Sequence, residues 1–204
     1  MARLSFFSFL VLLLTVLHMS CAANSAAATT RRARAPSATP FIRASCRVTR
    51  YPAVCVQSLS PFGSRIGQSK RQLTQISLLV SLSKARGAAV FVSRMTRLRG
   101  LSPREHGALV DCVENMGDTV DRLSQSVQEL GHTGRIMSQE FLWHMSNVQT
   151  WVSAALTDET TCVDGFGTPG MEGNVKAAIK RRIVQVAQVT SNTLALVNRF
   201  ASRH

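Results

Sequence analysis

The chain has 204 residues, of which 45% are hydrophobic, and it carries a formal net charge of +13 at pH 7. This length is sufficient for one domain with a buried core. The charge taken alone would favour nucleic acid or another anionic polymer as the partner. Whether that holds depends on the compartment, which the first residues indicate.

Residues 1–23 have the features of a secretory signal peptide. Arg3 gives a positive start, residues 6–17 are nearly all apolar, and small residues allow cleavage after Ala22 or Ala23. The apolar run of about 12 residues is shorter than the ~20 residues that span a bilayer, which argues against a membrane anchor. We therefore expect secretion and no membrane association after cleavage.

Cleavage would also remove one of the five cysteines. Four cysteines in an exported chain suggest two disulfides, with three possible pairings. None of the spacings is Cys-x-x-Cys, so a zinc or redox site is not expected. The four cysteines are Cys46, Cys55, Cys112 and Cys162.

Residues 24–45 are rich in Ala, Ser, Thr and Pro, which is typical of a flexible linker. Five of the 24 basic residues precede Cys46, so 19 basic and 11 acidic residues remain from there on, a net charge of +8. Export and disulfides make nucleic acid a poor partner. A cell-wall polyanion, or solubility alone, explains the surplus equally well.

From Cys46 onward helical periodicity dominates and strand signals are almost absent. A short helical piece at 46–60 ends at a Ser-Pro pair, and we expect residues 46–62 to form an N-terminal hairpin. A long helix is predicted over 64–98, ahead of Gly100. Its apolar positions are Leu78, Leu82, Ala85, Ala89 and Val92.

The clearest helix signal lies between Ser102 and Leu130. Ser102 can cap the helix, a proline follows at the first helical position, and Glu105 completes a capping box. Gly131 is expected to end the helix. The apolar residues alternate in steps of four and three, as in a heptad seam. They are Leu109, Val113, Met116, Val120, Leu123, Val127 and Leu130.

Two more helices are predicted, over 138–156 and 174–200. The polar run Thr-Asp-Glu-Thr-Thr is expected to end the first of them, with Cys162 just beyond. A bond from Cys162 to Cys112 would tie neighbouring helices across a loop of about 50 residues and contribute roughly 4 kcal/mol. Four long amphipathic helices with short loops predict an all-α, antiparallel up-down four-helix bundle over 63–204. Trp143 and Trp151 are expected in or beside the core. The apolar positions of the helix over 138–156 are Phe141, Met145, Val148 and Val152. Those of the helix over 174–200 are Ile179, Ile183, Val186, Thr190, Thr193, Val197 and Phe200.

The sequence contains no motif for catalysis. It lacks Gly-x-Ser-x-Gly, His-Glu-x-x-His and a phosphate-binding glycine loop. His106, His132 and His144 stand singly, and a lone histidine on a helix surface is usually solvated. We therefore predict no catalytic residue, no cofactor and no metal ligand.

The acidic residues, in contrast to the histidines, are concentrated in one part of the chain. Six of the 11 lie in the helix that follows Ser102, and four of them recur in steps of three and four, away from the apolar seam. Such a row is commonly a solvated face, but on a basic protein it is also a candidate docking surface. The four are Asp111, Glu114, Asp118 and Asp121, and the next helix offers Asn147, Thr150 and Thr157 beside them.

Four blocks in order, "CRVTRYPAVCVQSL", "ALVDCVENMGDTVDRL", "QTWVSAALTDETTCVDGF" and "TSNTLALV", resemble the plant invertase and pectin methylesterase inhibitors. The resemblance covers residues 46–200. It implies a four-helix bundle with an N-terminal helical hairpin, and the pairings Cys46–Cys55 and Cys112–Cys162. It also implies that the second, third and fourth bundle helices pack on a target enzyme.

The resemblance predicts a secreted protein of the apoplast that inhibits pectin methylesterase by covering the pectin-binding cleft in a one-to-one complex. Inhibition of acid invertase is the alternative, but such inhibitors carry a Pro-Lys-Phe-like tripeptide after the last cysteine. The chain has "GFGTPGMEGN" there. A second alternative is the pro-region of a pectin methylesterase, which is disfavoured because no catalytic domain follows. A third is a basic cell-wall protein that binds pectate.

Overall fold

A computed structural model describes residues 39–169 and 171–202, so the predicted signal peptide and residues 24–38 of the predicted linker lie outside the described residues. Every regular element in this part of the chain is a helix. In chain order they are α2 (Pro40–Cys46), α3 (Pro52–Leu59), the 3-10 turn η1 (Ser60–Phe62), α4 (Gly63–Ile66), α5 (Lys70–Met95), α6 (Pro103–His132), α7 (Gln139–Asp164) and α8 (Asn174–Ala201).

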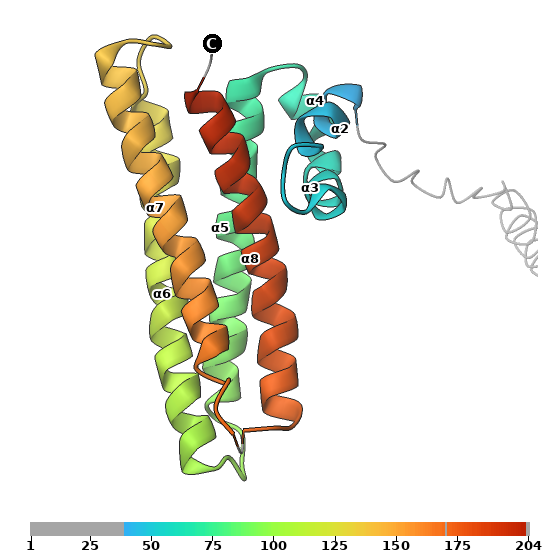
Figure 1. The fold of residues 1–204 in the computed structure, drawn as a ribbon, viewed down its shortest axis with the longest axis vertical. Coiled ribbons are helices and arrows are strands. Elements are labelled where there is room, and N and C mark those ends of the chain that lie inside the picture. Colours follow the sequence, from blue (N-terminus) through green and yellow to red (C-terminus); the bar gives the residue numbers. More distant parts are fainter. Residues whose placement is uncertain (1–38, 170, 203–204) are drawn as a thin grey trace, which may run out of the picture. The chain divides into compact units, whose positions relative to one another are not determined.

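Helices α5 to α8 form the bundle (Figure 1). Successive helices run in opposite directions, and each packs on two neighbours: α5 on α6 and α8, and α7 on α6 and α8. The predicted antiparallel four-helix bundle is therefore confirmed. The four helices therefore form a closed ring in cross-section, in the order α5, α6, α7, α8. The α6–α7 pair and the α5–α8 pair form opposite sides of this ring.

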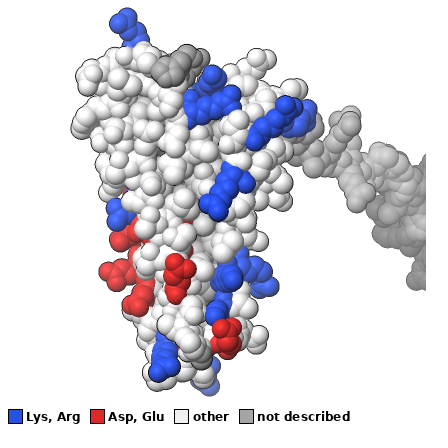
Figure 2. Space-filling model, in the orientation of Figure 1, with Lys and Arg blue, Asp and Glu red and all other residues white. Residues whose placement is uncertain are grey.

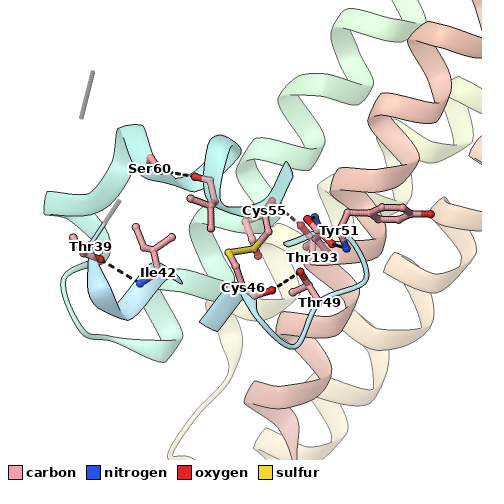
Figure 3. Close-up of a disulfide and its surroundings, with 11 residues drawn as sticks. Thr39, Ile42, Cys46, Thr49, Tyr51, Cys55, Ser60 and Thr193 are labelled. Carbon is pink, nitrogen blue, oxygen red and sulfur yellow. Dashed lines mark hydrogen bonds between the residues drawn. A yellow bond between two sulfur atoms is a disulfide. The ribbon is translucent and has the colours of Figure 1, made fainter. Parts of the chain in front are cut away.

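The short helices α2 and α3 form a hairpin closed by the Cys46–Cys55 disulfide (Figure 3). Helix α2 begins six residues before Cys46, inside the segment that we expected to be linker. The Thr39 hydroxyl accepts a hydrogen bond from the Ile42 amide and so caps the helix. The hairpin is fixed to α8, because the backbone N–H and carbonyl of Tyr51 both bond to the side chain of Asn192, each at 2.9 Å.

Three predicted helix boundaries were wrong. The segment 64–98 breaks at Gly67, whose φ of 54° lies in the left-handed region, and α5 restarts after the cap Ser69. Helix α6 continues past Gly131 to His132. Helix α7 continues through the polar run to Asp164, which places Cys162 inside it. The polar run stays helical because Glu159 within it and Cys162 just after it are both buried in the bundle.

The core is built largely as the periodicity predicts, with one shift in α6. Leu109, Met116, Leu123 and Leu130 are buried, but the seam valines between them are only half-buried. The buried positions are instead Cys112, Thr119 and Ser126, one residue earlier in each heptad. The two hydroxyls donate to the carbonyls four residues back, at 2.9 Å and 2.8 Å, so these polar groups are satisfied within the helix. In α5, similarly, Ala88 is buried and Ala89 is half-buried, whereas the predicted core positions of α7 and α8 are all buried.

Helix α5 is long and apolar enough to cross a membrane by length and composition alone. In the bundle its apolar residues have another explanation. Leu78, Ala85, Ala88 and Val92 are buried in the core formed with the other three long helices.

The α6–α7 turn exposes apolar side chains. Trp143, expected in or beside the core, is 59% exposed, while Trp151 is half-buried. Met137 in the turn is the one non-glycine residue with positive φ (70°) in the described chain. The core position next to Trp143 is filled by Phe141, which meets Phe200 edge to face at 5.5 Å between ring centroids.

Candidate functional site

The acidic stripe of α6 (Asp111, Glu114, Asp118 and Asp121) lies on the solvent-facing side of the bundle. All four residues are exposed, because they occupy the positions of α6 opposite its buried seam. None of the four forms an ion pair with another described residue. Figure 2 shows the acidic side chains gathered over α6 and α7, on the lower left of the molecule. The stripe is thus a charged surface without an internal partner.

An ion pair anchors α7 beside this stripe. The Arg122 Nε donates to the Asp158 Oδ2 at 2.7 Å, joining α6 to α7. Asp158 is only 15% exposed, so this carboxylate serves the helix contact and not the outer surface. The same helices are linked covalently by the Cys112–Cys162 disulfide. Both disulfides that the resemblance implies are therefore present, and the stripe stands on a cross-linked helix pair.

The three candidate residues of α7 are divided between two places. Asn147 is half-buried against α6, where its Nδ2 donates to the Glu129 Oε1 at 2.6 Å. Thr150 and Thr157 are exposed and line a shallow groove between α7 and α8. Gln149, Ser153 and Ala154 complete the α7 side of this groove, so this wall carries no charged side chain. We therefore retain Thr150 and Thr157 as surface candidates, whereas Asn147 has a contact of its own.

Two histidines that we took as single lie together near the α6–α7 turn. The rings of His132 and His144 have centroids 6.2 Å apart, and His144 Nδ1 bonds to the Glu129 Oε1 at 2.9 Å. Burial would raise the pKa of Glu129, but the hydrogen bonds from Asn147 and His144 outweigh it and lower this pKa. Glu129 is thus held as an anion. The described residues include no group of three or more His, Cys, Asp or Glu that could hold a metal ion.

Glu159 is a buried acid that the sequence reasoning missed. It lies between α7 and α8, fully buried, and Thr190 Oγ1 donates to its Oε1 at 2.8 Å. Its Oε2 has no hydrogen-bond partner among the described residues. Burial raises the pKa of Glu159 to about 8, with Asp158 adding to the effect and Thr190 opposing it. The residue therefore keeps its proton at neutral pH and adds no charge to the acidic side. Its position seven residues after Val152 would have identified it, had the helix been extended far enough.

A scan against protein-family models gives the decisive comparison. The model described as "Plant invertase/pectin methylesterase inhibitor" matches residues 40–196. The chain belongs to this family. The match begins at the first residue of α2 and ends at residue 196, five residues before the end of α8, so it includes the hairpin and nearly all of the bundle.

Relatives within the inhibitor family extend the likeness over nearly the full length. The chain is 46% identical to "Pectinesterase inhibitor 9" of Arabidopsis thaliana, over 96% of this chain and 94% of that protein. It is 42% identical to "Pectinesterase inhibitor 11" of the same plant, over 100% of both chains. Both relatives are named as inhibitors of an enzyme.

A crystal structure of a mutant pectin methylesterase inhibitor from Arabidopsis has the same fold. The TM-score is 0.61 at 17% sequence identity, with 75% of this chain and 92% of that chain covered. At this identity the likeness shows the fold alone.

Proposed function

We propose that this chain is a secreted protein that inhibits pectin methylesterase in a one-to-one complex, without chemistry of its own. Membership of the inhibitor family and two relatives named as pectinesterase inhibitors support the target. The features of a signal peptide at residues 1–23 support delivery to the apoplast.

The observation that carries the docking site is the unpaired acidic stripe. Exposed carboxylates without internal ion pairs keep their charge available to a partner with basic residues around its cleft. They stand on a helix pair fixed by a disulfide, so the surface needs little reordering on binding. The stripe would set the rate of encounter and the register of the complex more than its final affinity.

The groove beside Thr150 and Thr157 would supply the close contact. Beyond Gln149 its α7 wall consists of small neutral side chains, so an enzyme surface can approach the backbone of α7 there. Asn198 of α8 already accepts a hydrogen bond from Gln149 across the groove at 2.9 Å, which holds the two helices together. The inhibitor would then exclude pectin by occupying its cleft.

The function is tested by titrating the purified protein against a plant pectin methylesterase and an acid invertase in parallel. We expect de-esterification to stop at one inhibitor per enzyme, with sucrose hydrolysis unchanged. Full activity of several pectin methylesterases in excess inhibitor would overturn the proposal. Inhibition of invertase alone would assign the chain to the other target of its family.

Two matched double variants test the docking face. Glu114→Gln with Asp118→Asn removes two charges from the stripe, and Glu140→Gln with Asp164→Asn removes two exposed carboxylates elsewhere on α7. We expect the first to slow association roughly tenfold at low salt and the second to change it less than twofold. Equal slowing would mean that only net charge matters. A Thr157→Arg substitution should raise the inhibition constant by obstructing the groove without touching the core, and an unchanged constant would exclude the groove from the interface.

A further inference from the structure

The charges of this protein are sorted between the two sides of the bundle. Helices α6 and α7 contain ten of the 11 acidic residues and two arginines. Helices α5 and α8 contain ten basic residues and no acidic one. In Figure 2 the basic side chains accordingly lie mainly on the right, over α8 and the N-terminal hairpin. The α5–α8 side of the bundle is therefore cationic.

Most cations of this surface have no acidic partner. Among the described residues of α5 and α8, the ion pair that is present joins Lys176 to Glu172 of the preceding loop at 2.6 Å. Three others have neutral contacts. Arg71 donates to the Thr133 carbonyl at 3.0 Å, and Arg86 donates to the Ser124 hydroxyl at 3.4 Å. The Arg182 guanidinium lies 5.9 Å from the centroid of the Phe91 ring. The remaining exposed cations project into solvent, and they include Lys84, Arg94, Lys180 and Arg181.

We infer that the α5–α8 face binds de-esterified pectin, a linear polymer with a carboxylate on successive sugars. The cations are spread along two adjacent helices, so a single small anion cannot reach most of them. Lys84 and Arg94 alone are ten residues apart on α5, roughly 15 Å along the helix axis. A polyanion can engage such a row, and it gains affinity with each cation because bound counterions are released.

The partner is a polyuronate because of what the target enzyme makes. Hydrolysis of a pectin methyl ester replaces a neutral group by a carboxylate, so the product is anionic where the substrate is not. This identification rests on the proposed function. The acidic stripe lies on the opposite helix pair, and α8 contributes only Leu194 and Asn198 to the α7–α8 groove. Neither is one of the cations, so the polymer and the enzyme can be held at the same time. Enzyme activity would then create the surface that concentrates its own inhibitor.

Binding is measured by calorimetry of the purified protein with polygalacturonate at several NaCl concentrations. We expect the logarithm of the binding constant to fall linearly with the logarithm of the NaCl concentration. We expect no binding to fully methyl-esterified polygalacturonate. Absence of binding at about 50 mM NaCl, or equal binding to the esterified polymer, would overturn the inference. A single-stranded oligonucleotide that binds more tightly at equal concentration of charge would assign the face to another polyanion and equally overturn it.

The location on α5–α8 is tested with matched variants. Lys180→Gln with Arg181→Gln removes two exposed cations of α8, and Arg104→Gln with Arg135→Gln removes two exposed cations on the α6–α7 side. The first should weaken binding roughly 5- to 30-fold and make the salt dependence shallower, and the second should weaken it less than twofold. Equal losses would show that net charge and not this face is responsible. The α8 variant should still inhibit pectin methylesterase on highly esterified pectin, so failure of polymer binding and failure of inhibition are separate results.

Discussion

The α6–α7 pair and the α5–α8 pair are both antiparallel helix pairs of one bundle, yet different forces hold them. The acidic pair is joined by the Cys112–Cys162 disulfide and by the Arg122–Asp158 ion pair. Among the described residues, no disulfide or ion pair joins α5 to α8. This basic pair is held by apolar packing and by a buried hydrogen bond of 2.8 Å between the hydroxyls of Ser81 and Thr193.

This difference shows how the protein tolerates sorted charge. Like charges on one helix pair repel, and the repulsion within a face opposes folding. On the acidic side a covalent bond and an internal arginine counteract it. Keeping Glu159 protonated also removes one negative charge from that side. On the basic side the charges sit on long side chains that extend into solvent, where repulsion is screened.

The largest expected effect concerns Glu159 and pH. The pKa of Glu159 is about 8 in the folded protein, against 4.5 for a glutamate side chain free in water. Below pH 4.5 both states are protonated. As the pH rises towards 8 only the unfolded state loses its proton, so the free energy of unfolding falls by up to about 5 kcal/mol and then levels off. Glu159→Gln should remove this fall, as measured by urea denaturation from pH 4 to 9.

Glu129 changes the free energy of unfolding with pH in the opposite direction from Glu159, because folding lowers the pKa of Glu129. The stability that it adds is present above its unfolded pKa and is lost as the pH falls through the folded value. The difference between wild type and Glu159→Gln isolates the buried group, because Glu129 is common to both. Parallel stability curves for the two proteins would contradict the assignment of a protonated Glu159.

The second effect compares the two disulfides. Replacing both Cys112 and Cys162 by alanine opens a loop with a sequence separation of 50 residues and should lower the free energy of unfolding by about 4 kcal/mol. The matched change at Cys46 and Cys55 opens a separation of 9 residues and should lower it by roughly 2–3 kcal/mol. Thermal and urea denaturation give both values. A larger loss for the hairpin bond would mean that the cross-link between α6 and α7 contributes little to its own pair.

The smallest effect compares the polar links of the two pairs. Arg122→Gln breaks an ion pair whose arginine is 38% exposed, so we expect a loss of about 0.2–1 kcal/mol that diminishes with added salt. Ser81→Ala removes a buried hydrogen bond between α5 and α8 and should cost about 1 kcal/mol at any salt concentration. A salt-dependent loss in the serine variant would show that charge, and not the hydroxyl bond, couples the basic pair.

The acidic stripe shows what local sequence can establish about the site. Its steps of three and four, set against a buried seam, predicted that the four carboxylates share an exposed face, and the structure agrees. Asn147 shows the limit of such reasoning. Helical spacing placed it near Thr150, but which neighbour a side chain contacts depends on where α6 lies, and Asn147 turned out to bond to Glu129.

Sequence alone determined the helical class, the number of long helices and the capped start of α6, because periodicity and the Ser102–Glu105 capping box act within a few residues. Tertiary packing decided where helices end and which groups are buried. The polar run after Leu156 reads as a stop signal, yet α7 continues because α8 and the disulfide give Glu159 and Cys162 a buried place. The same packing set the two kinds of charge on opposite sides of the bundle, since only the order of helices around the ring determines which surfaces are adjacent.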